Sequence, residues 1–125
     1  MRRTPEPEAK AARQQANPYA SFLYRLQSAV RASDRDAVVG LIAFPLRVNV
    51  QGASRLYRDA DSLERDYDKV FTRKVRQAIL SQRAGALFVR DQGAMVGDGE
   101  LWFDRTCANA ACSPAGPVRI TAVNP

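Results

Sequence analysis

The chain of 125 residues contains no histidine. Histidine is the commonest general base near neutral pH and the commonest metal ligand in proteins. Its absence excludes every Ser-His and Cys-His nucleophile arrangement, so an active site would have to use Asp, Glu, Tyr, Lys or Arg. No motif of those residue types stands out, and we predict no catalytic residue. The sequence also lacks any apolar run near the roughly 20 residues that span a bilayer, so we expect no membrane span.

Cysteine is scarce, with only Cys107 and Cys112 present. Two thiols without histidine make a poor zinc site, because structural zinc takes four ligands. Their spacing also differs from the CxxC redox motif. The alternatives are a disulfide, two free thiols or a metal site, and the small residues between the cysteines favour a loop closed by a disulfide. Such a bond would indicate an oxidising compartment. We expect no metal and no cofactor.

Acidic residues are outnumbered, 13 against 19 basic residues, and the net charge is +6. The excess is spread along the chain, whereas nucleic-acid binders gather it on one face among aromatic side chains. The one tight cluster is Arg73, Lys74 and Arg76, near the end of a predicted helix that begins with acids. The helix dipole favours that order, so a solvated helix end is a better interpretation than a binding patch. We expect no nucleic-acid partner.

The first 17 residues are polar and without apolar periodicity, which predicts a disordered leader. They lack the apolar centre of a signal peptide. One hypothesis is that they remain after such a peptide was removed and a start methionine added. Together with the expected disulfide, this predicts a periplasmic or secreted protein. Residues 18–125 are expected to form one domain.

Helical periodicity dominates the first part of this domain, and strand periodicity dominates the rest. Pro18 suits a helix start, and capping boxes at 33–36 and 61–64 open two further helices. The predicted helices cover residues 18–32, a short segment that Pro45 ends, and 63–79 with a bend near Thr72. The predicted strands cover residues 46–50, 55–58, 86–90, 94–104 and 118–123. Helices gathered on one face of an antiparallel sheet make an α+β architecture.

The alternation within 94–104 assigns side chains to the two faces of that strand. The expected inward set is Met95, Gly97, Gly99, Leu101 and Phe103. The expected outward set is Val96, Asp98, Glu100, Trp102 and Asp104. We expect the two glycines to bend the strand and so to curve the sheet. Asp98 and Glu100 on an open face keep ordinary pKa values and are poor acid-base catalysts.

Three segments in this order carry a resemblance to a known family. They are Phe44-Pro45-Leu46-Arg47-Val48-Asn49, Tyr67-Asp68-Lys69-Val70-Phe71 and Gly97-Asp98-Gly99-Glu100-Leu101-Trp102-Phe103. Over about residues 18–124 the chain resembles the nuclear transport factor 2-like superfamily, and in particular its small exported bacterial members. The resemblance implies a cone, in which a strongly curved sheet wraps the helices and often leaves a pocket at the open end. Because relatives include enzymes, transport adaptors and accessory domains, the fold does not select a function.

The candidate ligand-binding residues of such a cone are Tyr24, Arg47, Tyr67, Phe71 and Phe103. Tyr67 and Phe71 lie on the buried face of the third helix, where core packing is the alternative to lining the pocket. Arg47 at the rim could hold a carboxylate. The alternative is a surface ion pair with Asp98 or Glu100.

The candidate interface residues are Asn49, Glu100 and Trp102. Trp102 has three interpretations: an exposed aromatic covered by arginine stems, the anchor of a sheet-to-sheet homodimer, or a platform for a ligand.

The preferred hypothesis is a non-catalytic exported domain that binds a small apolar or carboxylate ligand or a protein partner, as a homodimer. The alternative is a small isomerase or hydratase that uses Asp, Tyr and Arg inside the cone. Family members that combine Tyr with Asp would need Tyr19 or Tyr24 opposite an inward Asp, such as Asp98. An ionisable side chain projecting into a cavity would favour the enzyme.

Overall fold

The computed structural model describes residues 17–90, 93–107 and 115–125, the side chains of Cys107 and Ala115 excepted. Residues 1–16 of the expected leader, the turn residues Asp91 and Gln92, and the expected disulfide all fall outside these residues or side chains. The helices of the described part are α2 (Pro18–Arg31), α3 (Arg35–Val39), α4 (Ala60–Arg65), α5 (Tyr67–Val70), α6 (Arg73–Ser81) and a 3-10 turn, Ala84–Ala86. The strands are β1 (Ile42–Val50), β2 (Ala53–Tyr57), β3 (Phe88–Arg90), β4 (Gly93–Val96), β5 (Leu101–Cys107) and β6 (Ala115–Val123).

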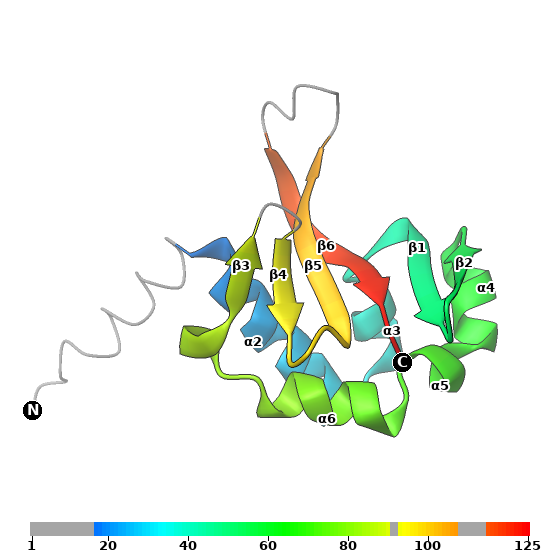
Figure 1. The fold of residues 1–125 in the computed structure, drawn as a ribbon, viewed down its shortest axis with the longest axis horizontal. Coiled ribbons are helices and arrows are strands. Elements are labelled where there is room, and N and C mark those ends of the chain that lie inside the picture. The colour runs from blue at the N-terminus through cyan, green and yellow to red at the C-terminus, as the bar shows by residue number, and fades with distance from the viewer. Residues whose placement is uncertain (1–16, 91–92, 108–114) are drawn as a thin grey trace, which may run out of the picture.

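The six strands form one twisted sheet in the order β2-β1-β6-β5-β4-β3. Every neighbouring pair is antiparallel except β1 and β6, which run parallel. The helices lie behind and below the sheet in Figure 1, so one face of the sheet is left uncovered by the described helices. The α+β class is therefore confirmed, and the wholly antiparallel sheet that we expected is wrong.

Helix α2 follows the sequence prediction closely. Asn17 caps its start, since its side chain accepts hydrogen bonds from the backbone N–H groups of Tyr19 and Ala20. Its buried stripe recurs at helical spacing and packs on the sheet, where the rings of Phe22 and Phe103 lie 4.8 Å apart. The helix thus forms one wall of the core.

The single helix expected over 63–79 is wrong, because this stretch forms parts of three separate helices. The capping box at its start uses Asp59 and Ser62 rather than Asp61 and Glu64. Thr72, the site of the expected bend, caps a new helix by accepting a hydrogen bond from the Val75 N–H at 3.3 Å. The chain is not helical at Phe71 and Thr72, so α5 and α6 point in different directions.

The strand expected over 94–104 is also wrong, because residues 97–100 form a turn between β4 and β5. Gly97 and Gly99 have φ of +58° and +106°, a conformation that suits a turn and departs from regular strand geometry. Val96 pairs with Leu101 across this turn, so both face the helices, while Met95 pairs with Trp102 on the outer face. Met95 and Val96 therefore face opposite to expectation, and the two glycines do not curve a strand.

Buried Gln27 ties three parts of the fold together. Its Nε2 donates to the carbonyl oxygens of Ile79, at 2.9 Å, and Gln82, at 2.8 Å. These carbonyls lie at the end of α6, where the Ile79 oxygen also accepts the Gln82 N–H at 3.3 Å. Gln82 in turn accepts the Gly97 N–H at 2.7 Å. Helix α2 is thus connected through α6 to the β4–β5 turn.

Replacing Gln27 with leucine is expected to lower the free energy of unfolding by about 1–3 kcal/mol, because the Ile79 and Gln82 carbonyls both lose their hydrogen bond from Gln27. Ser28→Ala, on the exposed face of the same helix, should change stability by no more than about 0.5 kcal/mol. Urea denaturation measures both. Equal stability of the two variants would show that the Gln27 hydrogen bonds contribute nothing.

Candidate functional site: a helix-lined pocket at Tyr67

The space between helices and sheet is filled by side chains. Phe71 and Phe103, two of the expected ligand contacts, are fully buried in the core together with the apolar stripe of α2. The ring of Phe71 stacks on Tyr67 at 5.0 Å between centroids. These two phenylalanines therefore pack the core, and a cavity has to be sought at its edge.

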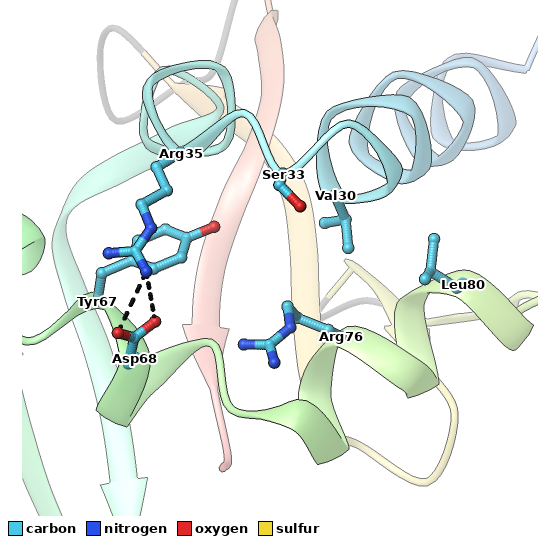
Figure 2. A pocket seen from close by; sticks show the side chains of 7 residues that line it. All are labelled: Val30, Ser33, Arg35, Tyr67, Asp68, Arg76 and Leu80. Carbon is cyan, nitrogen blue, oxygen red and sulfur yellow. Dashed lines mark hydrogen bonds and ion pairs between the residues drawn. The ribbon is translucent and has the colours of Figure 1, made fainter.

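Such a cavity, of about 290 Å³, lies where the end of α2, the start of α3, α5 and α6 meet. Figure 2 shows its lining residues, which come from all four helices and the turn between α2 and α3. They are Val30, Ser33, Arg35, Tyr67, Asp68, Arg76 and Leu80. One side of the cavity is therefore apolar, and the other carries hydroxyl groups and charges.

The end of α2 positions Ser33. The Asp34 N–H bonds the Ala29 carbonyl at 2.9 Å and the Ser33 N–H bonds the Val30 carbonyl at 3.0 Å, which is the Schellman arrangement. Ser33 takes the left-handed position of that motif, with φ of 55°. Asp34 then caps α3 by accepting the Ala37 N–H. Two consecutive caps thus place Ser33 at the rim of the pocket.

Tyr67 is the buried polar group of the pocket, with only 6% of the residue exposed. Its ring lies beside the Arg35 guanidinium, and its hydroxyl reaches into the space between the helices (Figure 2). No hydrogen bond to this hydroxyl occurs within the described residues, although a buried hydroxyl ordinarily has one. Burial raises the pKa of Tyr67, and the nearby Arg35 and Arg76 oppose that rise. The hydroxyl is therefore protonated at neutral pH and free to donate.

The two arginines of the pocket differ in their partners. Arg35 contacts both carboxylate oxygens of Asp68, at 2.9 and 3.2 Å, and lies over the Tyr67 ring at 4.8 Å. Its charge is thus largely compensated. Arg76 donates one N–H to the Phe71 carbonyl and has no carboxylate partner in the part of the chain described. Arg76 therefore supplies the uncompensated positive charge of the pocket.

The break between α5 and α6 brings Tyr67 and Arg76 together. In one continuous helix, nine residues at about 100° each would place them on opposite faces. The sequence pattern indicated Tyr67 but not its neighbours Ser33, Arg35 and Arg76, and Arg76 was expected at a solvated helix end. Thr72, a residue type that commonly caps helices, was the signal that a new helix starts there.

The remaining candidates lie elsewhere. Tyr24 is exposed on α2. Arg47, Asn49 and Trp102 lie together in a groove on the outer face of the sheet. Glu100 lies in the β4–β5 turn, where it accepts the Asp98 N–H at 2.7 Å. Among the described residues Arg47 forms no ion pair with either acid, so the expected pair is wrong.

A tyrosine–aspartate pair does occur, with a partner that we did not expect. The Tyr19 hydroxyl donates to Asp104 Oδ1 at 2.9 Å. Burial, followed by the Asp104 hydrogen bond, raises the pKa of Tyr19. The raised pKa makes the Tyr19 hydroxyl a weaker acid, and its hydrogen bond to Asp104 ties α2 to β5.

Comparison with known proteins gives no relative: no protein-family model, no curated protein and no solved structure matches the chain. Residues 17–90, 93–107 and 115–125 contain no group of three or more acidic or cysteine side chains placed to hold a metal ion. None of the described helices is both long and apolar enough to cross a membrane.

Proposed function

We propose that the protein is a non-catalytic binding domain whose helix-lined pocket takes a small carboxylate with a short apolar body. The observation that carries this proposal is the buried Tyr67 hydroxyl, which has no partner among the described residues and shares a cavity with Arg76. A carboxylate could accept from both groups at once, and charge-assisted hydrogen bonds of this kind are the strong ones. Val30 and Leu80 would contact the apolar body of the ligand.

The size of the cavity limits the ligand. A volume of about 290 Å³ is at the small end for ligand pockets, which run from about 300 to 1,000 Å³. A single ring or a short chain fits this space, whereas a nucleotide does not. The proposed class is therefore that of small monocarboxylates such as benzoate.

An isomerase or hydratase in the same pocket is the alternative. Such an enzyme would need a carboxylate free to take a proton from a bound substrate. Asp68 is the acid that lines the pocket, and it is held by Arg35 at 2.9 Å. This ion pair favours binding over acid-base chemistry.

The cone of the nuclear transport factor 2-like superfamily is part of the same proposal. Its support is a twisted sheet of six strands with the described helices gathered on one face. Export to the periplasm or beyond the cell and the Cys107–Cys112 disulfide stay predictions, and a homodimer is one of the competing uses of the surface around Trp102. Alkylation of the native protein followed by mass spectrometry would test the disulfide, and sedimentation would test the homodimer.

Titration with benzoate, followed by NMR, tests the pocket. We expect saturable shifts of the Tyr67 and Arg76 resonances, and none with benzamidine, the matched cation. Arg76→Gln should weaken benzoate binding at least about tenfold, because hydrogen bonds to charged groups contribute about 1.5–3 kcal/mol. Tyr67→Phe should weaken it about 2–10-fold, the effect of one neutral donor.

Arg73→Gln is the matched control, because Arg73 is exposed on the same helix and outside the pocket lining. It should bind benzoate like the unmodified protein. Equal shifts with benzoate and benzamidine, or unchanged affinity in Arg76→Gln, would contradict the proposal.

A further inference from the structure

The outer face of the sheet carries a second and larger hollow. It has a volume of about 550 Å³ and lies across β1, β6, β5 and β3. No described helix covers this face, which is turned to the viewer in Figure 1. We call this hollow the outer groove; its lining includes Arg47, Asn49, Phe88, Arg90, Trp102 and Asn124.

A single row of paired residues builds the floor of the outer groove. Phe88 pairs with Met95, Met95 with Trp102, Trp102 with Ala122, and Ala122 with Arg47. Cross-strand partners share a face of the sheet, so these side chains stand next to one another. Phe88 is exposed and Trp102 half-buried. Apolar surface therefore runs across the centre of the groove.

Positive charges stand at both ends of the row. Arg47 lies on β1, and Arg90 lies on β3 with its guanidinium over the Phe88 ring at 4.4 Å. Neither arginine has an ion-pair partner within the described residues, and no acid is among the described residues that line the groove. Asp98 and Glu100 lie in an adjoining hollow that also holds Lys74. The outer groove is thus complementary to negative charge.

The separation of the two arginines sets the length of the occupant. In the sheet order, β3 is the fourth strand from β1. Neighbouring strands lie about 4.8 Å apart, so the two backbones are about 19 Å apart. This spacing between backbones is longer than a small anion. An extended peptide rises about 3.3 Å per residue, so about six residues cover the distance.

We propose that the outer groove binds an extended acidic segment of another protein, with acids at both ends and an apolar residue at its centre. The terminal carboxylates would pair with Arg47 and Arg90, while the central side chain contacts Trp102. A second copy of this chain is a poorer occupant. In a two-fold dimer the same patch meets itself, which would bring together two surfaces of positive charge.

The only tryptophan of the chain lies in this groove, so its fluorescence reports occupancy directly. The probe is a heptapeptide of sequence Glu-Gly-Glu-Phe-Glu-Gly-Glu, blocked at both ends. We expect saturable quenching or a blue shift, at least tenfold weaker in an Arg47→Glu/Arg90→Glu double variant. Arg73→Glu carries the same kind of charge change outside the groove and should bind as before.

Any of the following results would overturn the proposal. No fluorescence change at millimolar peptide would do so, as would equal binding of the peptide in which lysine replaces every glutamate. Tighter binding of a single-stranded oligonucleotide would assign the groove to nucleic acid instead. A dimer in sedimentation that the double variant dissociates would assign it to a second copy. None of these results bears on benzoate binding at Tyr67, so the two sites are tested separately.

Discussion

Replacing Phe103 with alanine is expected to lower the free energy of unfolding by about 3–5 kcal/mol. Phe103 is fully buried, lies 4.8 Å from the Phe22 ring, and contributes to the contact between α2 and β5. Truncation would remove this apolar surface from the core and leave a cavity that neighbouring side chains fill only in part. A domain of this size has a total stability of only about 5–15 kcal/mol, so the variant should be close to unfolding.

Phe88→Ala is the matched control, since Phe88 is 42% exposed on the edge strand β3. Truncation of the Phe88 side chain should lower the free energy of unfolding by less than about 1 kcal/mol, as for surface residues in general. Thermal and urea denaturation of both variants measure the difference. Similar losses in the two variants would show that α2 does not pack on β5 as described.

The second large effect is expected at Gly93, the first residue of β4. Its φ is +106°, a conformation that residues with a side chain rarely adopt. A Cβ there would collide with the Phe103 carbonyl oxygen and lie 2.7 Å from the Asp104 Cβ. Strain at positive φ costs about 1–3 kcal/mol, and overpacking costs a similar amount. Gly93→Ala should therefore lower the free energy of unfolding by about 2–4 kcal/mol.

Gly85→Ala provides the comparison, because a Cβ at Gly85 would have no neighbour within 4 Å and its φ is not positive. This variant should keep or slightly raise stability, since alanine reduces the entropy of the unfolded chain. A Gly93→Ala protein as stable as Gly85→Ala would show that β4 does not approach β5 so closely.

The elements that the sequence predicted well are those in which one periodicity holds throughout. Helix α2 has an apolar stripe, a proline at its start and a cap at Asn17. The second half of strand β1 agrees as well, since Leu46 and Val48 are buried and Arg47 is exposed. The helix that we expected to run up to Pro45 is wrong over its last residues, because β1 already begins at Ile42. Local pattern and tertiary packing favour the same structure in these segments.

The errors arose where a single periodicity was continued through a turn. The alternation from 94 to 104 predicts one strand, but Asp98-Gly99 is a typical hairpin-turn pair. The reversal pairs Val96 with Leu101, which inverts the facing of everything before the turn. Likewise, the helical period across 63–79 predicted only a bend near Thr72, where one helix ends and another begins, and the approach of Arg76 to Tyr67 was missed. Pocket residues brought together by such breaks are not visible as a motif.

The two proposed sites differ in how far their binding groups are exposed to water and salt. The pocket at Tyr67 is small and partly buried, so its hydroxyl and the Arg76 guanidinium act away from bulk water, where hydrogen bonds are stronger. The outer groove is open, and its arginines act in solvent, where salt screens them. Binding in the groove should therefore weaken with added salt much more than binding in the pocket.

A crystal structure of the protein with benzoate is the most direct test of the proposed function. The account predicts the carboxylate between the Tyr67 hydroxyl and the Arg76 guanidinium, at hydrogen-bond distance from both, with the ring against Val30 and Leu80. Benzoate bound elsewhere, or a Tyr67 hydroxyl that bonds to another group of the protein in the presence of benzoate, would contradict it.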